Sequence, residues 1–482
     1  MLTYQDFLAV GENQNDIMAF VRSAINQYKS TEEYQINVIS DQYTRKRNPD
    51  SAQAVKTIYT VTGRQIMDTY SSNYKVGRAF FPLFITQQVQ YLLSNGVTWN
   101  NKDTADKLGT RQAPFDSRLQ DAAYKALDAT LSYGFWNLDR SGHGYVEVFT
   151  SLEFVPLFDE NNGALMAGIR WWQIDAQKPL RATLYQIDGY TDYIWDRRDE
   201  GGNVDADGEI LHEKRPYVVR VTKTDIDDER IYTGENYPML PIVPFWGNKL
   251  HQNEIIGLRE KMFAYDMIES GFCDSVEEAS YVYWAISNAP GMDEQSLAEF
   301  LARVKRVHAA VTEDNGSVAT PHQIEAPTAS REALLERLEK DLFKDAMAFD
   351  PEHIASGNAT ATQIRASYNL LDMKTNDFEY CVLDFINGIL ALAGIEDKPT
   401  FTRDRNVNVT EEITAVMQAA SALDDEYVTK KILNLLGDGD QAEEIIQRKI
   451  ADEVTRMREP EEPEEPEGGE VNGEEETGSG TS

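Results

Sequence analysis

The sequence predicts an α+β protein that contains one very long helix and a small module inserted between two other helices. Three patterns favour this class. Short β-rich runs separated by turns fill residues 144–245, apolar residues at helical spacing dominate the chain on either side, and an apolar ladder with spacings of four and three extends from 358 to 394. Strands and helices segregated in this way along a chain are typical of α+β folds.

The opening part of the chain, residues 1–70, is expected to be mostly helical. Apolar residues there recur at the spacing of one helix face, namely Ile17, Val21, Ala24 and Tyr28. A second helix is predicted over about 78–94, interrupted by Pro82 and ended by Asn95-Gly96. It belongs to the next expected region, an α+β body covering 71–245.

The later part of that body is predicted to be an antiparallel sheet region. Its β-rich runs cover 145–149, 167–172, 182–185, 192–195 and 217–221. Turns rich in Gly, Asn and Asp separate these runs, as expected for strands that pair with their sequence neighbours.

Two helices are expected to flank a compact αβ insert. Apolar residues from Ile255 to Phe272 mark the first helix, and a charged helix from about 330 to Asp350-Pro351 forms the second. The predicted strands and short helix of the insert cover 281–286, 307–312, 320–324 and 297–304. Because so few strands do not make a stable free sheet, we expect them to pair with strands of neighbouring copies.

A small, polar link precedes the long helix. It carries no bulky side chain and consists of Ser356, Gly357, Asn358, Ala359, Thr360, Ala361 and Thr362. Such a segment can approach another polymer closely. The ladder after it predicts one helix over 358–394, about 50 Å long, whose apolar seam should meet other elements or other copies of the chain. A helical region over 396–458 follows.

The composition describes an acidic protein with a large core. The 482 residues are 41% hydrophobic and carry a formal charge of -35, which argues against a sequence-reading nucleic-acid binder because phosphate affinity needs clustered Lys and Arg. Residues 459–482 hold ten glutamates and no base, and predict a disordered tail; the remaining chain has a charge of about -25.

No signature of a disulfide framework, a metal site or a membrane segment is present. Cys273 and Cys381 are the only cysteines, the six histidines show no ligand spacing, and no apolar run approaches the length of about 18 residues needed to span a bilayer. We therefore expect a soluble cytosolic protein without cofactor or metal. A partial calcium-loop pattern at 205–209 is better explained as a hairpin turn.

Enzyme motifs for phosphate, dinucleotide, zinc or serine chemistry are also missing. Trp171-Trp172 and nearby tyrosines could form a sugar-stacking platform, with carboxylates as acid and base. No carboxylate pair stands out among 81 acidic residues, so a carbohydrate-active enzyme is only an alternative, and no catalytic residue is proposed.

The order of these elements resembles the portal proteins of tailed double-stranded DNA bacteriophages, in the subgroup typical of phages with long non-contractile tails. Local matches are Phe84–Leu93 (FITQQVQYLL) before Ser94-Asn95-Gly96, the run 241–245 (PIVPF) with Gly247-Asn248, and the helix at 254–278. The similarity covers about 70–395 and extends more loosely over the helices to 458. Ser94-Asn95 departs from the glycine common in the family, and 356–360 departs from its usual Ser-Gly followed by an apolar helix start.

The resemblance implies a ring-forming portal fold with named parts. These are a wing (1–70 and 71–245), a stem (246–278 and 328–355), a clip (279–327), a tunnel loop and tunnel helix (356–395), a crown (396–458) and the acidic tail (459–482). It also implies a non-enzymatic subunit of a ring of about twelve copies. Another virion protein, such as a head-completion or scaffold-associated protein, is the alternative and would lack this order of elements.

The resemblance further implies partners and candidate site residues. DNA would pass through the ring without sequence-specific binding, driven by the terminase large subunit, and the ring would contact a head-tail adaptor and the major capsid and scaffolding proteins. It would lie at the portal vertex of the virion, after assembly in the host cytoplasm. The link 356–362 becomes the tunnel loop. Candidate channel charges are Lys340, Lys344 and Arg365, and candidate clip contacts are Arg303, Lys305 and Arg306.

Both groups of basic residues have a simpler explanation. Lys340 and Lys344 alternate with acids and could form surface pairs one helical turn apart instead of a positive band. Arg303, Lys305 and Arg306 could complement the dipole at a helix end instead of binding an acidic partner or nucleic acid.

Overall fold

The chain divides into two compact units, of which the larger contains residues 1–357 and 365–405. The computed structural model describes all residues except 1, 60–62, 70, 140, 176–177, 197–207, 224–229, 281–282, 288–317, 323–327, 352–360, 404–408, 438, 440–441 and 459–482. The described elements are a mixture of helices and antiparallel strands, which confirms the predicted α+β class.

Helices make up the N-terminal part of the larger unit, as predicted, and return after its sheets. They are α1 (Tyr4–Val10), α2 (Gln14–Lys29), α3 (Glu32–Thr44), α4 (Pro49–Gln53), α5 (Phe80–Leu93), α6 (Thr104–Leu108), α7 (Phe115–Asp128), α8 (Arg259–Ala279), α10 (Thr328–Asp345) and α12 (Asn369–Ala393). Helix α11 (Ala361–Ser367) lies at the boundary between the units. The smaller unit contains α13 (Val409–Ala419), α14 (Asp425–Leu436) and α15 (Ala442–Arg458).

The predicted antiparallel region forms a five-stranded sheet, a three-stranded sheet and a two-stranded pair (Val218–Lys223 with Arg230–Glu235), and it begins at Leu131, earlier than expected. The first has the order β10-β9-β8-β7-β6 and the second β13-β4-β5. Their strands are β4 (Leu131–Leu138), β5 (Gly144–Thr150), β6 (Phe154–Phe158), β7 (Leu165–Trp172), β8 (Leu180–Gln186), β9 (Gly189–Trp195), β10 (Glu209–Arg215) and β13 (Ile242–Trp246).

The remaining described strands form two-stranded sheets. They are β1 (Thr57–Tyr59) with β2 (Gln65–Met67), β3 (Val97–Thr98) with β16 (Thr400–Phe401), β11 (Val218–Lys223) with β12 (Arg230–Glu235), and β14 (Tyr283–Ser287) with β15 (Val318–His322). The last pair lies in the predicted insert and pairs within one chain. The expected strand 307–312 and helix 297–304 lie outside the described residues.

Helix α12 passes through the main hydrophobic core of the larger unit. Its inward side chains are buried and pack among α5, α7, α8, α10 and the β13-β4-β5 sheet. They include Phe378, Val382, Phe385, Ile386 and Ile389. The apolar ladder seen in the sequence therefore meets other elements of its own unit.

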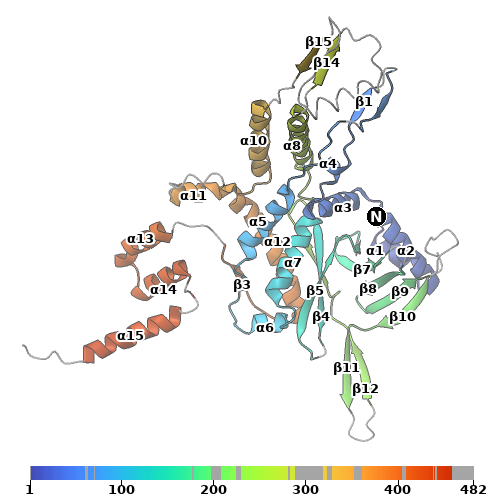
Figure 1. Ribbon diagram of the computed structural model, residues 1–482. Coiled ribbons are helices and arrows are strands. Elements are labelled where there is room, and N and C mark those ends of the chain that lie inside the picture. The colour runs from blue at the N-terminus through green and yellow to red at the C-terminus, as the bar shows by residue number, and fades with distance from the viewer. Residues whose placement is uncertain are drawn as a thin grey trace, which may run out of the picture. The chain divides into compact units, whose positions relative to one another are not determined.

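A second core lies between the N-terminal helices and the five-stranded sheet. Val21 and Ile25 of α2 pack with Ile169 of β7 and Leu184 of β8, and all four are fully buried. Figure 1 shows α1 and α2 beside this sheet, and α8 and α10 running side by side toward β14 and β15.

The long helix predicted over 358–394 is wrong as a single element, because α11 and α12 are separate and Tyr368 lies between them. The charged helix also ends earlier than expected. Helix α10 stops at Asp345, and Met347 takes a left-handed conformation with φ 51°. Main-chain N–H groups of Met347 and Ala348 donate to Lys344 and Phe343, which closes the helix end.

Pro82 does not interrupt its helix. It is the third residue of α5, and the first turn of a helix tolerates proline because its N–H groups have no intrahelical partner. Helix α8 begins at Arg259 rather than near 255, after Gly257 with φ 85°.

Candidate functional site

The candidate site is the part of the larger unit where α8, α10 and α12 share the main hydrophobic core, because two of the predicted channel charges lie on α10. Lys340 and Lys344 lie on α10, and Arg365 lies on α11 and is exposed. Ala361 and Thr362 begin α11. Residues 356–360 of the predicted loop, and Arg303, Lys305 and Arg306, lie outside the described residues.

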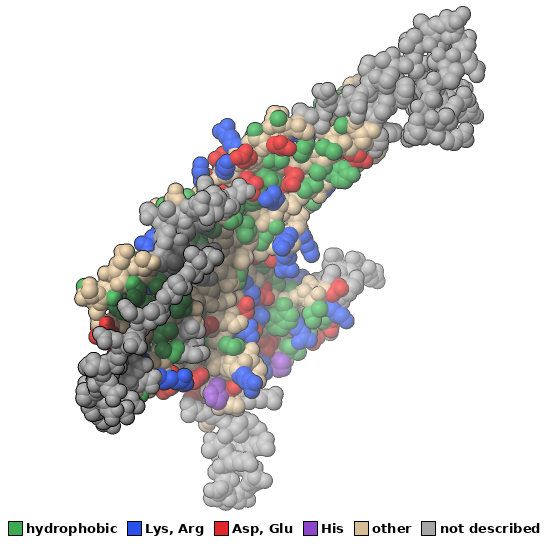
Figure 2. Space-filling view, turned by 60° about the vertical axis from the view of Figure 1, so that its left-hand side comes forward, with side chains coloured by type: hydrophobic (Ala, Val, Ile, Leu, Met, Phe, Trp, Pro, Cys, Tyr) green, Lys and Arg blue, Asp and Glu red, His purple; other side chains and the backbone are tan. Residues whose placement is uncertain are grey.

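The exposed side of α10 carries ion pairs one helical turn apart. Lys340 Nζ lies 2.5 Å from Glu336 Oε1, and Arg337 Nε lies 3.9 Å from Asp341 Oδ2. Lys344 is exposed and has no ion-pair partner among the described residues. Figure 2 shows acidic, basic and hydrophobic side chains intermixed on the face that it presents. Lys340 thus takes part in a surface pair of the kind that the simpler explanation requires.

Helices α8 and α10 are linked to each other near both ends. Arg331 Nη1 of α10 donates to Gly271 O and to Ser275 Oγ of α8, each at 2.7 Å. At the other end, Lys261 pairs with Asp345. The two helices are therefore fixed side by side by polar contacts as well as by packing.

One face of α8 holds the main chain of residues 74–78. The N–H groups of Tyr74, Val76 and Arg78 donate to Asp274 (2.8 Å), Ser270 (3.0 Å) and Asp266 (2.9 Å). The acceptors are spaced four residues apart on the helix and the donors two apart on the segment. This register fits because one helical turn and two residues of extended chain both advance roughly 6 Å.

Two of the three acceptors of this ladder, Asp266 and Asp274, are buried acids with further partners. Asp266 also accepts hydrogen bonds from Asn48 Nδ2 (2.6 Å) and Ser51 Oγ (3.0 Å). Burial raises the pKa of Asp266, and these hydrogen bonds act in the opposite direction. Asp274 is paired with Lys56 at 2.6 Å. Each carboxylate thus has defined partners, so the ladder holds the segment 74–78 on α8.

Asn248 organises the entry to α8. Its side chain donates to Gln252 O (2.7 Å) and Glu254 Oε1 (2.9 Å), and accepts from the N–H groups of Leu250 and Gln252. The preceding Gly247 lies against α7, where an added Cβ would be 2.5 Å from Ala126 O. These contacts explain why a Gly-Asn pair stands at this exit from the sheet.

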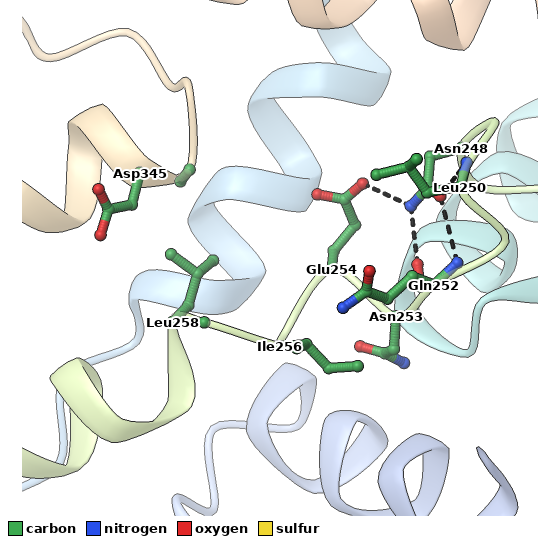
Figure 3. Close-up of a pocket in the computed structure, with 10 residues that line it drawn as sticks. Asn248, Leu250, Gln252, Asn253, Glu254, Ile256, Leu258 and Asp345 are labelled. Carbon is green, nitrogen blue, oxygen red and sulfur yellow. Dashed lines mark hydrogen bonds between the residues drawn. The ribbon is translucent and has the colours of Figure 1, made fainter.

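A cavity of about 380 Å³ separates this entry from the end of α10. Figure 3 shows Asn248, Gln252 and Glu254 on one side of it and Asp345 on the other. Lys374 of α12 joins the two sides, because its Nζ lies 2.8 Å from Glu254 Oε2 and donates to Ala346 O at 3.0 Å. The polar groups here bind one another, so the cavity belongs to a structural joint.

Neither this joint nor the ladder on α8 was predicted from the sequence. A signal for the ladder was present, since Asp266, Ser270 and Asp274 share one helix face with buried apolar residues. Polar side chains on a buried face need partners, and these partners come from a segment about 190 to 200 residues away in sequence.

The described residues show no site for a metal ion, since no group of His, Cys, Asp and Glu there could hold one. Cys273 and Cys381 are free thiols. None of the helices in the described ranges combines the length and apolar character needed to cross a lipid bilayer.

Comparison with known proteins identifies relatives of the chain. The portal protein of Bacillus phage SPP1 is 25% identical over 331 residues, which cover 67% of this chain and 62% of the relative. The portal protein of Clostridium phage phiCD119 is 27% identical over 197 residues, covering 38% of this chain and 43% of the relative. The chain thus aligns with less than two thirds of the length of each.

Solved structures that the comparison matches to this chain come from gene transfer agent particles. A chain from the virion of the native particle has a TM-score of 0.42 at 10% identity, with 74% of this chain and 90% of that chain covered. A chain from the neck of the native particle, computed with C12 symmetry, has a TM-score of 0.41 at 12% identity, with 79% and 96% covered.

A family model gives the broadest match. The model described as phage portal protein, SPP1 Gp6-like, matches residues 23–455. Since this range covers most of the 482 residues, the chain belongs to the SPP1 Gp6-like family of phage portal proteins.

Proposed function

We propose that the chain is the subunit of a portal ring through which double-stranded DNA enters a phage capsid and later leaves it. The observation that carries this proposal is the family match over residues 23–455. Copies related by a rotation that closes would form a ring, with about twelve subunits as the working number. The ring would lie at one vertex of the virion, after assembly in the host cytoplasm.

The described structure supports this role through its slender helix pair. Helices α8 and α10 run together from the body to the β14-β15 sheet (Figure 1), so a ring of such pairs would surround a passage. We assign them to the stem, and α12 to the tunnel helix. The smaller unit, with α13, α14 and α15, would be the crown.

The acidic composition is compatible with a conduit for DNA. The chain has a formal charge of -35, so a ring of copies would repel the phosphate backbone rather than bind it tightly. Weak binding lets a duplex slide. The force for packaging would come from the terminase large subunit, and a head-tail adaptor and the capsid and scaffolding proteins would bind the outside of the ring.

The link 356–362 would be the narrowest part of the passage. Its side chains are small, and Ala361 begins α11. Replacing Ala361 with Trp should therefore reduce DNA packaging or retention in phage that carry the variant. Unchanged packaging and retention would remove the constriction from this segment.

The basic residues Lys340 and Lys344 are proposed as a thin positive band facing the passage. The exposed position of Lys344 supports this, whereas the ion pair between Lys340 and Glu336 supports the surface-pair alternative. Reversing both charges with Glu should change the length of packaged DNA. An unchanged length would favour the surface-pair explanation.

The clip is proposed to become complete only in the ring. Strands β14 and β15 pair with each other, and a two-stranded sheet is marginally stable alone. Partner strands from a neighbouring copy would satisfy its edges, while Arg303, Lys305 and Arg306 would contact clip partners. Amide exchange that is equal in monomer and ring over 283–287 and 318–322 would contradict this.

Negative-stain imaging of the purified full chain tests the central proposal. A hollow annulus of about a dozen lobes is expected. Labelling of the chain in intact particles should place it at the single vertex that joins head and tail. A solid particle, or a label spread over the capsid, would overturn the proposal.

A further inference from the structure

Both ends of the segment that runs from Asp350 to Ser367 meet at one point in the larger unit. The ring of Phe349, before the segment, stacks on the ring of Tyr368, after it, with centroids 4.3 Å apart and planes 4° apart. Tyr368 also stacks on Tyr91 of α5 at 5.6 Å and 11°. Tyr368 and Tyr91 are 6% and 4% exposed, so the contact lies inside the protein.

The main chain of Phe349 is held by one glutamine. Gln87 Nε2 donates to Phe349 O at 2.8 Å, and the Phe349 N–H donates to Gln87 Oε1 at 3.2 Å. Gln87 lies on α5, whose neighbouring residues Phe84 and Gln88 are buried. The side-chain amide of Gln87 thus satisfies both main-chain groups of Phe349, the residue just before the segment.

The approach to Phe349 is also fixed. Lys374 Nζ donates to Ala346 O, and Met347 adopts φ 51° although it is not glycine. A left-handed conformation is unfavourable for a residue with a Cβ, and it persists where the surrounding contacts determine it. The turn after α10 is therefore held in place from both sides.

The return of the chain is fixed in the same way at the first turn of α12. The N–H of Asp372 donates to Tyr368 O at 2.8 Å, and Tyr91 Oη donates to Asp372 Oδ1 at 2.6 Å. Arg403 Nη1 binds the same carboxylate oxygen at 3.1 Å. Tyr91 therefore contacts both the aromatic stack and the helix that follows it.

We propose that Gln87, Tyr91 and Tyr368 are positioning residues for the DNA passage. Together they hold the two ends of the segment 350–367 at the same place in the larger unit and so form its anchor. This inference rests on the proposed function, in which part of that segment faces DNA. Moving DNA exerts drag on whatever it touches. Because both ends of the segment are fixed at one place, DNA that moves past can displace the residues between them only over a limited distance. This limit applies whatever conformation the segment takes, since closing a chain into a loop restricts its reach.

Hydrogen exchange on the purified full chain tests the anchor itself. Tyr368→Ala should speed exchange by roughly fivefold or more at both 346–349 and 369–372, because it removes two aromatic contacts. Tyr368→Phe keeps the ring and should keep most of the protection. Tyr380→Ala, which removes an exposed tyrosine of α12, should leave exchange at 346–349 unchanged. Wild-type protection of 346–349 in Tyr368→Ala would overturn the anchor.

The role in DNA handling needs a second readout in phage. Particles with Tyr368→Ala or Gln87→Ala should assemble and incorporate the ring, but retain packaged DNA about fivefold less often than particles with Tyr368→Phe. Gln90→Ala is the matched control, because Gln90 also lies on α5 but its side-chain amide donates to Tyr124 Oη. Equal retention in all variants would overturn the positioning role.

The two experiments separate this inference from the proposed function. If the wild-type protein formed no ring, the proposed function would fail, and with it the role of the anchor in DNA handling. The exchange experiment would still decide whether the anchor exists, because it needs only the folded chain.

Discussion

Glu254 and Lys374 form an ion pair of 2.8 Å between the entry to α8 and the first part of α12. Their side chains are only 18% and 15% exposed, and Lys374 also donates to Ala346 O at the end of α10. One lysine therefore connects three helices that come from different parts of the sequence. The pair lies where the proposed stem joins the body.

Replacing only Lys374 should destabilise the larger unit more than replacing both Lys374 and Glu254. Lys374→Met leaves Glu254 without its cation in a mostly enclosed site, and we expect a loss of roughly 2–4 kcal/mol. The double variant Lys374→Met/Glu254→Gln should lose less than the sum of the single variants. Urea unfolding of all four proteins measures the coupling energy.

The matched control is the surface pair Lys340–Glu336, whose side chains are 47% and 65% exposed. Lys340→Met should leave the unfolding midpoint almost unchanged, because exposed pairs contribute little. A coupling energy near zero for Glu254 and Lys374 would show that the joint does not depend on their pairing.

Replacing the carboxylate of Asp266 should destabilise the protein, even when the substituent is the amide of asparagine. It accepts hydrogen bonds from the Arg78 N–H, from Asn48 and from Ser51, and it is fully buried. Asp266→Ala leaves several buried donors unpaired, which should cost about 3 kcal/mol. Asp266→Asn turns one acceptor into a donor that faces donors, so it should also destabilise. Thermal unfolding that is unchanged in Asp266→Asn would contradict this account.

The core helices were predictable from the sequence because their signal is local. The ladder residues Leu371, Phe378, Val382, Phe385 and Ile389 are buried on α12, as periodicity indicated. The break at Tyr368 was not predictable, because it accompanies stacking on Phe349 and Tyr91, and these contacts depend on tertiary structure.

Strands β4 and β6 were not predicted from the sequence. Strand β4 is buried on both faces over residues 131–136, and Gly134 lies in its interior, where glycine is unfavourable for a strand. Strand β6 contains Pro156, which lowers any strand prediction, yet β6 is the edge of its sheet and an edge tolerates proline. Each strand therefore contains a residue that weakens the prediction of a strand from sequence.

The candidate site was predictable only in part. The exposed position of Lys344 and the order of helix, insert and helix follow from sequence pattern and family resemblance. The joint around Lys374 and the ladder on α8 could not be derived, because each joins residues distant in sequence whose side chains have no distinctive motif. The roles of these residues in DNA passage stay predictions.

The buried carboxyl of Asp128 should make stability depend on pH. Burial raises its pKa from 3.8 to about 6, although Thr44 donates to it at 2.5 Å. The folded state therefore binds the proton more tightly than the unfolded state, and stability should fall by roughly 1–3 kcal/mol as pH rises from 4 to above 6. Asp128→Asn cannot ionise and keeps an oxygen for Thr44, so it should remove this slope.

Unfolding midpoints at pH 4, 5, 6 and 7 check this expectation. Asp106→Asn, an exposed substitution on α6, is the control and should retain the wild-type slope. If Asp128→Asn retained it as well, the pH dependence would have to come from another group.

Two helical glycines should respond to alanine with opposite signs. Gly388 of α12 lies against β13, where an added Cβ would be 2.5 Å from Val243 Cγ1. Val243 is β-branched and held in a strand, so it cannot move aside cheaply, and Gly388→Ala should destabilise by roughly 1–3 kcal/mol. Gly271 of α8 has no atom within 4 Å of the added Cβ, and Gly271→Ala should stabilise by about 0.5–1 kcal/mol. Because both substitutions add the same methyl group to a helix interior, differing urea midpoints isolate the packing of α12 on β13. Equal midpoints would mean that α12 does not approach the sheet this closely.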